Sequence, residues 1–338
     1  MKKRVIIPLL LSLSMLLSLL SCGVSDPAPK SKTYYDYFDT VISLSDYSGM
    51  SESEFSALTA RIEEELSSYH RLFDIYNEYD GVVNVATLNR LAGKGAVKVS
   101  RELFNLLEFG KQAYELTGGE VNIAMGALLA RWHDCRTQAL ETGTTTLPSE
   151  GELIELYSHS DIADLILDGE AMTAELRDAE MSLDVGAVAK GYATERIAEM
   201  LEAEGVTGFV INAGGNVRMI GKKPSGNGWV IGIENPLGNG YSHKLTKADT
   251  SVVTSGAYQR YFTHNGKNYG HIIDKDTLRP AEHHLSVSIS VNDSGLADVL
   301  STALFSMSYE EGLALIRSTE GAEAYWVRLD SSVVTSLD

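Results

Sequence analysis

The second half of this 338-residue chain concentrates short runs of β-branched residues, each bounded by Gly, Asn or Pro. Such runs predict strands, because Val, Ile and Thr suit a pleated backbone and the bounding residues suit turns. Two helical patterns, at about 188–204 and 295–307, lie between and after these runs. Strands and helices do not alternate evenly, which favours an α+β fold over a doubly wound parallel sheet. The strands are expected at residues 209–214, 216–221, 228–235, 250–256 and 284–292.

The first half is predicted to be more helical. A helix that starts after Ser51 would carry an apolar face with helical spacing. A second helix is expected over about Arg101–Leu116, ending at Gly118, which suits a left-handed C-cap. Residues 137–150 have no apolar period and predict a loop. The apolar face of the first helix consists of Phe55, Leu58, Ile62, Leu66 and Tyr69.

The N-terminus has the features of an export signal. A basic start precedes an apolar run, and Leu19-Leu20-Ser21-Cys22 follows. This ending resembles the lipobox of bacterial lipoproteins, in which the Cys is freed by cleavage and lipidated; the alternative is an ordinary secretory signal with a fortuitous Cys. We expect a signal peptide at 1–21, lipidation at Cys22, a flexible tether at 22–32, and a folded part at 33–338. The protein would then be exported and anchored by lipid to a membrane of the bacterial cell envelope.

The charge of the chain restricts its ligands. The net charge is −18, and removal of residues 1–21, whose charged residues are three cations, makes it −21. Such a surface repels nucleic acid, so any anionic ligand needs local cations, helix N-termini or a metal ion. With Cys22 assigned to lipid, Cys135 is left without an internal disulfide partner. The fold must therefore depend on its apolar core, in one domain or in two intimate lobes.

The segment LDVGAVAKGY, Leu183–Tyr192, joins an acid, two glycines and a lysine at the expected start of a helix. The amide groups of a helix N-terminus favour an anion, and Lys190 adds a full positive charge. The spacing is not that of a phosphate-binding Walker A loop. The segment thus predicts an anion site, with the alternative that Asp184 caps the helix and Lys190 is solvated.

A second helix start carries possible metal ligands. If Ser294 caps this helix, Asp298 and Thr302 lie one turn apart on one face. Carboxylate and hydroxyl oxygens suit Mg²⁺ better than Zn²⁺. The alternative is that Asp298 only complements the helix dipole while Thr302 packs inside.

Other motifs exclude common folds and leave one histidine as a candidate base. The Gly214-Gly215 turn is followed by strand residues, so it is not a Rossmann dinucleotide fingerprint. The segment around Ser255 and His271 lacks the Gly-x-Ser-x-Gly elbow of α/β-hydrolases. His271 is either a functional residue or a structural strand residue. The spacing in Trp132–Cys135 matches no metal motif.

Six segments, taken in order, resemble the motifs of the FAD:protein FMN transferase (ApbE-like) family. The resemblance covers nearly all of the chain from about Tyr34 onward. It implies an ApbE-like, T-fold-related α+β fold with mixed sheets and packed helices. The six segments are Leu183–Tyr192, Asn212–Asn216, Trp229–Pro236, Thr254–Arg260, His271–Asp274 and Ala297–Ala303.

The resemblance also implies an activity and a set of site residues. The family transfers FMN from FAD to a Thr or Ser hydroxyl of an acceptor flavoprotein and releases AMP. His271 is then the candidate general base. The residues implied to contact FAD are Phe38, Tyr76, Glu120, Val121, Asn122, Asp184, Lys190 and Ile272. Those implied to hold Mg²⁺ are Ala187 through its carbonyl, Asp298, Ser301 and Thr302.

Three departures from the family pattern affect the N-terminal and adenine-side contacts. Asp39 replaces the Gly of a Met-Gly-Thr motif, Asn122 replaces an Asp, and Leu278 replaces a Gly. The metal positions are intact. Two other functions stay open: an FAD pyrophosphatase that gives FMN and AMP, and a non-catalytic FAD-binding lipoprotein.

Overall fold

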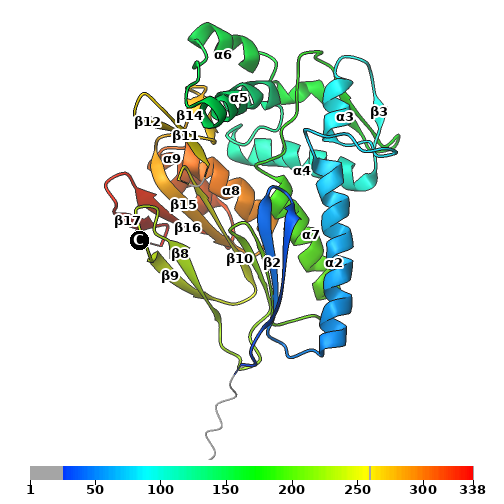
Figure 1. Ribbon diagram of the computed structural model, residues 1–338, viewed down its shortest axis with the longest axis vertical. Helices are drawn as coiled ribbons and strands as arrows, with labels where there is room; N and C mark the ends of the chain where they lie inside the picture. Colours follow the sequence, from blue (N-terminus) through cyan, green and yellow to red (C-terminus); the bar gives the residue numbers. More distant parts are fainter. Residues whose placement is uncertain (1–25, 259, 338) are drawn as a thin grey trace, which may run out of the picture.

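The computed structural model describes residues 26–258 and 260–337, and its largest element is an eight-stranded sheet. Each pair of neighbouring strands in this sheet is antiparallel (Figure 1). The α+β prediction is confirmed, whereas the expectation of mixed sheets is not met by this sheet. In spatial order its strands are β1 (Lys30–Tyr37), β2 (Thr40–Asp46), β6 (Phe209–Ala213), β7 (Asn216–Ile220), β10 (Thr250–Gly256), β15 (His284–Val291), β16 (Glu323–Arg328) and β17 (Val333–Thr335).

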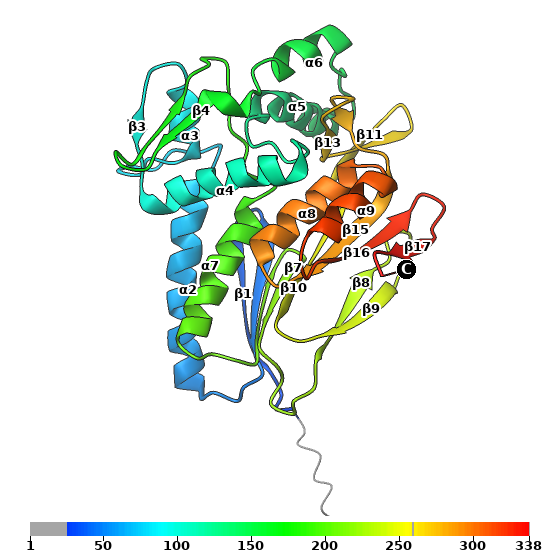
Figure 2. The same ribbon diagram turned by 180° about the vertical axis from the view of Figure 1, so that it is seen from behind.

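Helices cover one face of the sheet. Helix α7 packs on β6 and β7, and α8 packs on β10 and β15. Figure 2 shows α2 and α7 side by side along the sheet, with α8 crossing obliquely beside them. The other face carries a separate hairpin of β8 (Trp229–Glu234) and β9 (Tyr241–Lys247), whose Trp229 and Leu245 are buried against it. The helices on the covered face are α2 (Glu52–Phe73), α7 (Ala189–Ala203), α8 (Ser294–Ser306) and α9 (Tyr309–Ser318).

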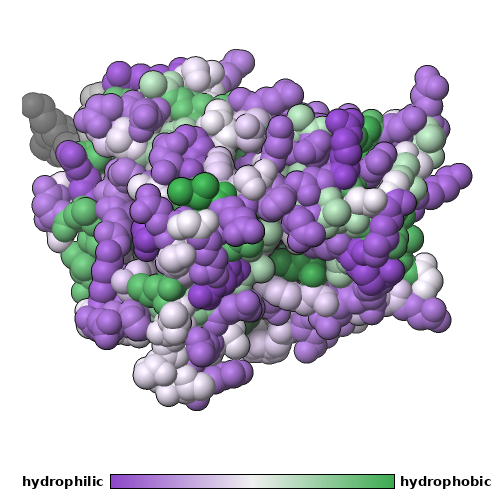
Figure 3. All heavy atoms as spheres, turned by 90° about the horizontal axis from the view of Figure 1, so that it is seen from above, coloured by the Kyte–Doolittle hydropathy of each residue, from purple (hydrophilic) through white to green (hydrophobic). Residues whose placement is uncertain are grey.

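A group of helices and short strands covers one end of the sheet and of the helix layer (Figures 1 and 2). Seen from above, this end is mainly hydrophilic, with apolar side chains in small separate groups (Figure 3). None of the helices in the described ranges is long and apolar enough to cross a membrane. The elements here are α3 (Val85–Arg90), β3 (Val97–Lys98), α4 (Arg101–Thr117), α5 (Gly126–Thr142), α6 (Glu150–Tyr157), η1 (Ile162–Asp164), β4 (Leu165–Asp168), β5 (Thr173–Leu176), β11 (Tyr261–His264), β12 (Lys267–Gly270), β13 (Ile273–Asp274) and β14 (Arg279–Pro280).

The predicted helices of the first half form where their local signals place them. Helix α2 starts with a capping box in which the Ser51 hydroxyl accepts from the Glu54 amide and the Glu54 carboxylate accepts from the Ser51 amide. Its apolar face is confirmed, because Phe55, Leu58, Ile62 and Leu66 are buried and Tyr69 is partly buried. Helix α4 ends at Gly118, which has a φ of 61° as the C-cap prediction requires. Capping and periodicity therefore fix these two helices.

Two predicted loops are partly regular structure. Strand β1 begins at Lys30, so the last three residues of the expected tether pair with β2. An exposed edge strand needs backbone partners rather than apolar side chains, which is why its polar residues did not reveal it. Within 137–150, α5 continues to Thr142, and a capping box of Ser149 and Glu152 starts α6. Cys22 and the signal peptide lie outside the described residues.

Candidate active site

A cavity of about 380 Å³ lies where the end of the main sheet meets α5 and the first turns of α7 and α8. Of the thirteen predicted site residues of the folded part, only Ser301 does not line it. Residues from distant parts of the sequence are thus brought to one cavity. Those that line it are Phe38, Tyr76, Glu120, Val121, Asn122, Asp184, Ala187, Lys190, His271, Ile272, Asp298 and Thr302.

Asp298 is a buried carboxylate of the cavity, held by the first turn of α7. Its side chain is only 6% exposed, and its Oδ2 accepts from the Gly191 amide at 2.9 Å. The same oxygen lies 3.5 Å from the Lys190 ammonium. Lys190 is therefore paired rather than simply solvated, and Asp298 faces the first turn of α7. The start of α8 differs from the prediction, because Asp293, and not Ser294, is the N-cap.

The close approach of α7 and α8 depends on Gly191. A Cβ built on Gly191 would lie 2.5 Å from the Cβ of Asp298 and 2.5 Å from the carbonyl oxygen of Ser294. Contacts this short do not occur between real side chains and backbone. The glycine of the Lys-Gly-Tyr motif is therefore needed for packing, in addition to any contact with a ligand.

The oxygen atoms near Asp298 fit part of the coordination sphere of a magnesium ion, which water and substrate oxygens would complete. Thr302 follows Asp298 by one helical turn, and Ala187 lines the same cavity. No group of three or more His, Cys, Asp or Glu side chains in the described ranges can hold a metal alone. One carboxylate with neutral oxygens matches the sites in which Mg²⁺ keeps waters and binds substrate phosphates. Ser301 supports this arrangement from behind, since its Oγ donates to the Asp298 carbonyl and contacts Ser255 Oγ at 2.9 Å.

Asp184 does not cap α7, so that alternative is wrong. The helix starts at Ala189, and the Asp184 carboxylate instead accepts from the Gly186 amide at 2.8 Å, which orders the turn before the helix. Burial raises the pKa of Asp184, although the Gly186 hydrogen bond and the nearby positive charge of Lys190 oppose this rise. Asp184 thus shapes the loop that presents Ala187 and Lys190 to the cavity.

His271 faces the cavity from the segment that joins β12 and β13. Its Nδ1 lies 3.2 Å from the Arg260 carbonyl oxygen. Surrounding protein atoms and the positive charges of Arg260 and Lys190 lower the pKa of His271 to about 4. The ring is therefore neutral at pH 7, and when Nδ1 donates to the Arg260 carbonyl, Nε2 is the nitrogen that can accept a proton.

The loop before α5 contributes its predicted residues in different ways. Glu120 forms an ion pair with Lys275 at 3.2 Å, while burial raises the pKa of its carboxyl. Asn122 donates to the Ser160 carbonyl and accepts from the Ala124 amide, so its side chain holds the loop in shape. At the position where the family pattern has Asp, the oxygen and the nitrogen of the Asn122 side chain are therefore both hydrogen-bonded within the protein.

The other two departures occur at positions with left-handed backbone. Asp39 has a φ of 49° and Leu278 a φ of 58°, in the region that glycine adopts most readily. The chain keeps the turn geometry at both places with a non-glycine residue. Phe38, with a φ of 54°, donates its amide to His70 Nδ1 and places its ring beside Phe73 at the cavity wall.

One face of α5 was missed by the sequence analysis. Trp132, His133 and Arg136 line the cavity at helical spacing, and the His133 ring lies 5.5 Å from that of Tyr76. The Trp132 indole donates to the Leu278 carbonyl at 3.0 Å and so fixes the helix. This helical spacing is the signal in the sequence from which the cavity-lining face of α5 can be predicted.

Comparisons with known proteins give matches over most of this chain. A family model described as the ApbE family matches residues 38–326. A Klebsiella pneumoniae (strain 342) protein named FAD:protein FMN transferase is 30% identical over 287 residues, covering 84% of this chain and 86% of the relative. A Treponema pallidum (strain Nichols) protein of the same name is 35% identical over 268 residues, covering 75% and 72%. The crystal structure of the ApbE protein from Thermotoga maritima matches with a TM-score of 0.80 at 27% identity, covering 91% of this chain and 97% of that chain.

Proposed function

We propose that the cavity of this chain, which belongs to the ApbE family, binds FAD together with a magnesium ion. The activity is that of an FAD:protein FMN transferase, which moves FMN from FAD to a protein. The assignment of the cavity rests on one observation: Asp298, Lys190 and His271 line the same cavity. A pyrophosphate near so acidic a protein needs cations, and these residues offer an ammonium, a carboxylate for a metal and a neutral base.

The reaction breaks the phosphoanhydride bond of FAD and forms a phosphoester with the acceptor. The hydroxyl oxygen of a Thr or Ser attacks the phosphorus on the riboflavin side, and AMP leaves with the bridging oxygen. His271 accepts the hydroxyl proton, and Lys190 lies where its charge can balance that of the phosphates. Asp298, Thr302 and the Ala187 carbonyl would hold Mg²⁺, which stabilises negative charge on the leaving phosphate. Bound pyrophosphate would also offset the cations that lower the pKa of His271.

Replacing His271 with alanine is expected to slow transfer on the order of 10²–10⁴-fold while FAD affinity changes little. A base acts mainly in the transition state, so kcat should fall far more than binding. Single-turnover rates and FAD fluorescence titrations measure the two effects separately. Loss of FAD binding without a separate rate defect would identify His271 as a binding or structural residue.

The function is tested by incubating the purified mature chain with FAD, Mg²⁺ and a panel of candidate acceptor domains. Intact mass and AMP release are then measured. A mass gain equal to FMN less water, with an equal amount of AMP, supports transfer. Free FMN with AMP and no protein adduct would indicate the pyrophosphatase, and unchanged bound FAD would indicate a binding lipoprotein.

We also propose a lipid anchor at Cys22, on the basis of the Leu-Leu-Ser-Cys sequence after an apolar run. Such an anchor would keep the enzyme among acceptor flavoproteins of the cell envelope. Cys22→Ser is expected to move the protein from the membrane fraction to the soluble fraction. A wild-type protein cleaved at another position, with an unmodified Cys22, would refute the proposal.

A further inference from the structure

Two contacts, one turn apart, join α7 to α8. At the first, the Gly191 amide donates to Asp298 Oδ2 at 2.9 Å. At the second, the Glu195 carboxylate accepts from the Ser294 amide at 2.6 Å. Gly191 and Glu195 are four residues apart on α7, as Ser294 and Asp298 are on α8. The contact between Glu195 and Ser294 therefore helps to fix the angle and distance at which the two helices cross, and the hydrogen bond from Gly191 to Asp298 depends on that crossing.

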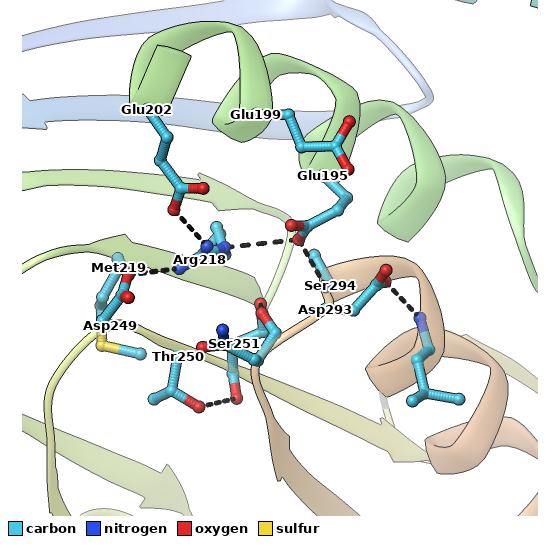
Figure 4. A network of polar contacts seen from close by, with 12 residues as sticks. Glu195, Glu199, Glu202, Arg218, Met219, Asp249, Thr250, Ser251, Asp293 and Ser294 are labelled. Atoms are coloured by element: carbon cyan, nitrogen blue, oxygen red, sulfur yellow. Dashed lines mark hydrogen bonds and ion pairs between the residues drawn. The ribbon is translucent and has the colours of Figure 1, made fainter. Parts of the chain in front are cut away.

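Glu195 does this as a buried acid in a network behind the cavity (Figure 4). Its side chain is 8% exposed, and its Oε2 lies 3.3 Å from Nε of Arg218, which is 2% exposed. Arg218 extends from β7 and also pairs with Glu202 at 2.5 Å and with Asp249 at 3.3 Å. The carboxylate of Glu195 therefore connects the sheet, α7 and the start of α8.

The network also reaches the wall of the cavity. The Ser294 hydroxyl donates to Asn216 Oδ1 at 2.5 Å, and Asn216 lines the cavity. The start of α8 is thus held from α7 through its amide and from β7 through its hydroxyl. A shift of this helix start would move Asp298, which lies one turn further along the same helix.

Burial works against the charged form of this acid. Burial raises the pKa of Glu195 to about 7; the Ser294 hydrogen bond and Arg218 oppose the rise, while Asp293 and Glu202 add to it. Buried ion pairs are often replaceable by apolar residues without loss of stability. The cap of α8 does not require it either, since the Asp293 carboxylate already accepts from the Leu296 amide. Stability and capping therefore do not account for a carboxylate at this position.

We propose that Glu195 is a positioning residue that holds α8 at the crossing where Asp298 meets Lys190 and can serve a metal ion. This inference rests on the proposed function. Glu195 itself is not among the described residues that line the cavity. It acts through the Ser294 amide on the placement of Asp298.

The test compares Glu195→Gln with Glu199→Gln in the purified mature chain. Gln keeps the volume of Glu195 but removes its charge. In the wild type Oε2 faces both the Ser294 amide and Arg218 Nε, and a neutral amide oxygen in its place would hold both donors more weakly. Glu199 lies one turn further along α7, has a side chain 51% exposed and pairs with Arg196 three residues earlier, so it is the matched control. FAD affinity is measured by fluorescence in EDTA and across a Mg²⁺ titration.

For Glu195→Gln, we expect an unchanged FAD affinity in EDTA and about a tenfold higher Mg²⁺ concentration for half-maximal binding, the lower end of the effect typical of residues that orient a metal ligand. Glu199→Gln should match the wild type in both. Equal loss of affinity with and without Mg²⁺, or no loss in either, would overturn the proposal, because neither depends on the placement of Asp298.

Amide hydrogen exchange in the ligand-free proteins separates this inference from the proposed function. Faster exchange at residues 294–298 in Glu195→Gln, relative to Glu199→Gln, supports the positioning role even if the wild type binds no FAD. Unchanged exchange there overturns it. A wild type that binds no FAD would instead refute the proposed function.

Discussion

Replacing Asp298 with alanine is expected to lower the rate of FMN transfer on the order of 10²–10³-fold, a loss comparable with that expected for His271→Ala. Asp298 supplies the charged ligand of the proposed metal site, and a metal ion contributes several kcal/mol to such a reaction. The variant also removes the partner of the Gly191 amide and of Lys190. Thr302→Val should lose less activity, because it removes a neutral ligand.

Transfer rates measured with EDTA, Mg²⁺ and Zn²⁺ test this expectation. EDTA should stop the wild type, Mg²⁺ should restore it and Zn²⁺ should restore it poorly. Asp293→Ala is the matched control: it removes a carboxylate from the start of the same helix and costs about 1 kcal/mol of capping energy, but it leaves Asp298 in place. Full transfer by Asp298→Ala in EDTA would refute the metal site.

Replacing Gly191 with alanine is expected to destabilise the fold and to abolish most of the activity. The new methyl group would overlap Asp298 and the Ser294 carbonyl, so α7 and α8 must move apart. Overpacking of this kind costs about 1–3 kcal/mol, although Ala is a better helix former than Gly. The movement would also separate Asp298 from Lys190. Chemical unfolding and transfer assays measure the two consequences.

Gly151→Ala provides the control for this substitution. Gly151 is exposed within α6, and a Cβ there would meet no atom within 4 Å. This variant should be as stable as the wild type or up to about 1 kcal/mol more stable, with unchanged activity. Wild-type stability in Gly191→Ala would show that the two helices tolerate a wider spacing than the structure implies.

Local signals in the sequence were sufficient for much of this fold. The capping box at Ser51, the left-handed glycine after α4 and the β-branched runs each act within a few residues, and each predicted its element. The motif resemblance then identified residues that the fold brings to one cavity. Asp298 and Lys190 are far apart in sequence but lie together because their helices cross.

The features that were missed depend on contacts between distant segments. Nothing near Glu195 in the sequence indicates that its partners are Arg218 and the Ser294 amide. Strand β1 forms because β2 supplies its hydrogen bonds, which its own residues do not reveal. The prediction of Ser294 as the cap was wrong by one residue, because Asp293 and Ser294 are both common caps and only the packing of α8 distinguishes them.

The path of β1 has a mechanical consequence. This strand leads from Lys30, near the start of the described chain, to the turn at Phe38 and Asp39 that lines the cavity (Figure 2). Eight extended residues span about 25 Å. Because β1 is hydrogen-bonded along β2, its two ends are held at a fixed distance from each other. With the proposed anchor at Cys22, β1 would add a fixed distance of this length between the anchored end of the chain and the catalytic cavity.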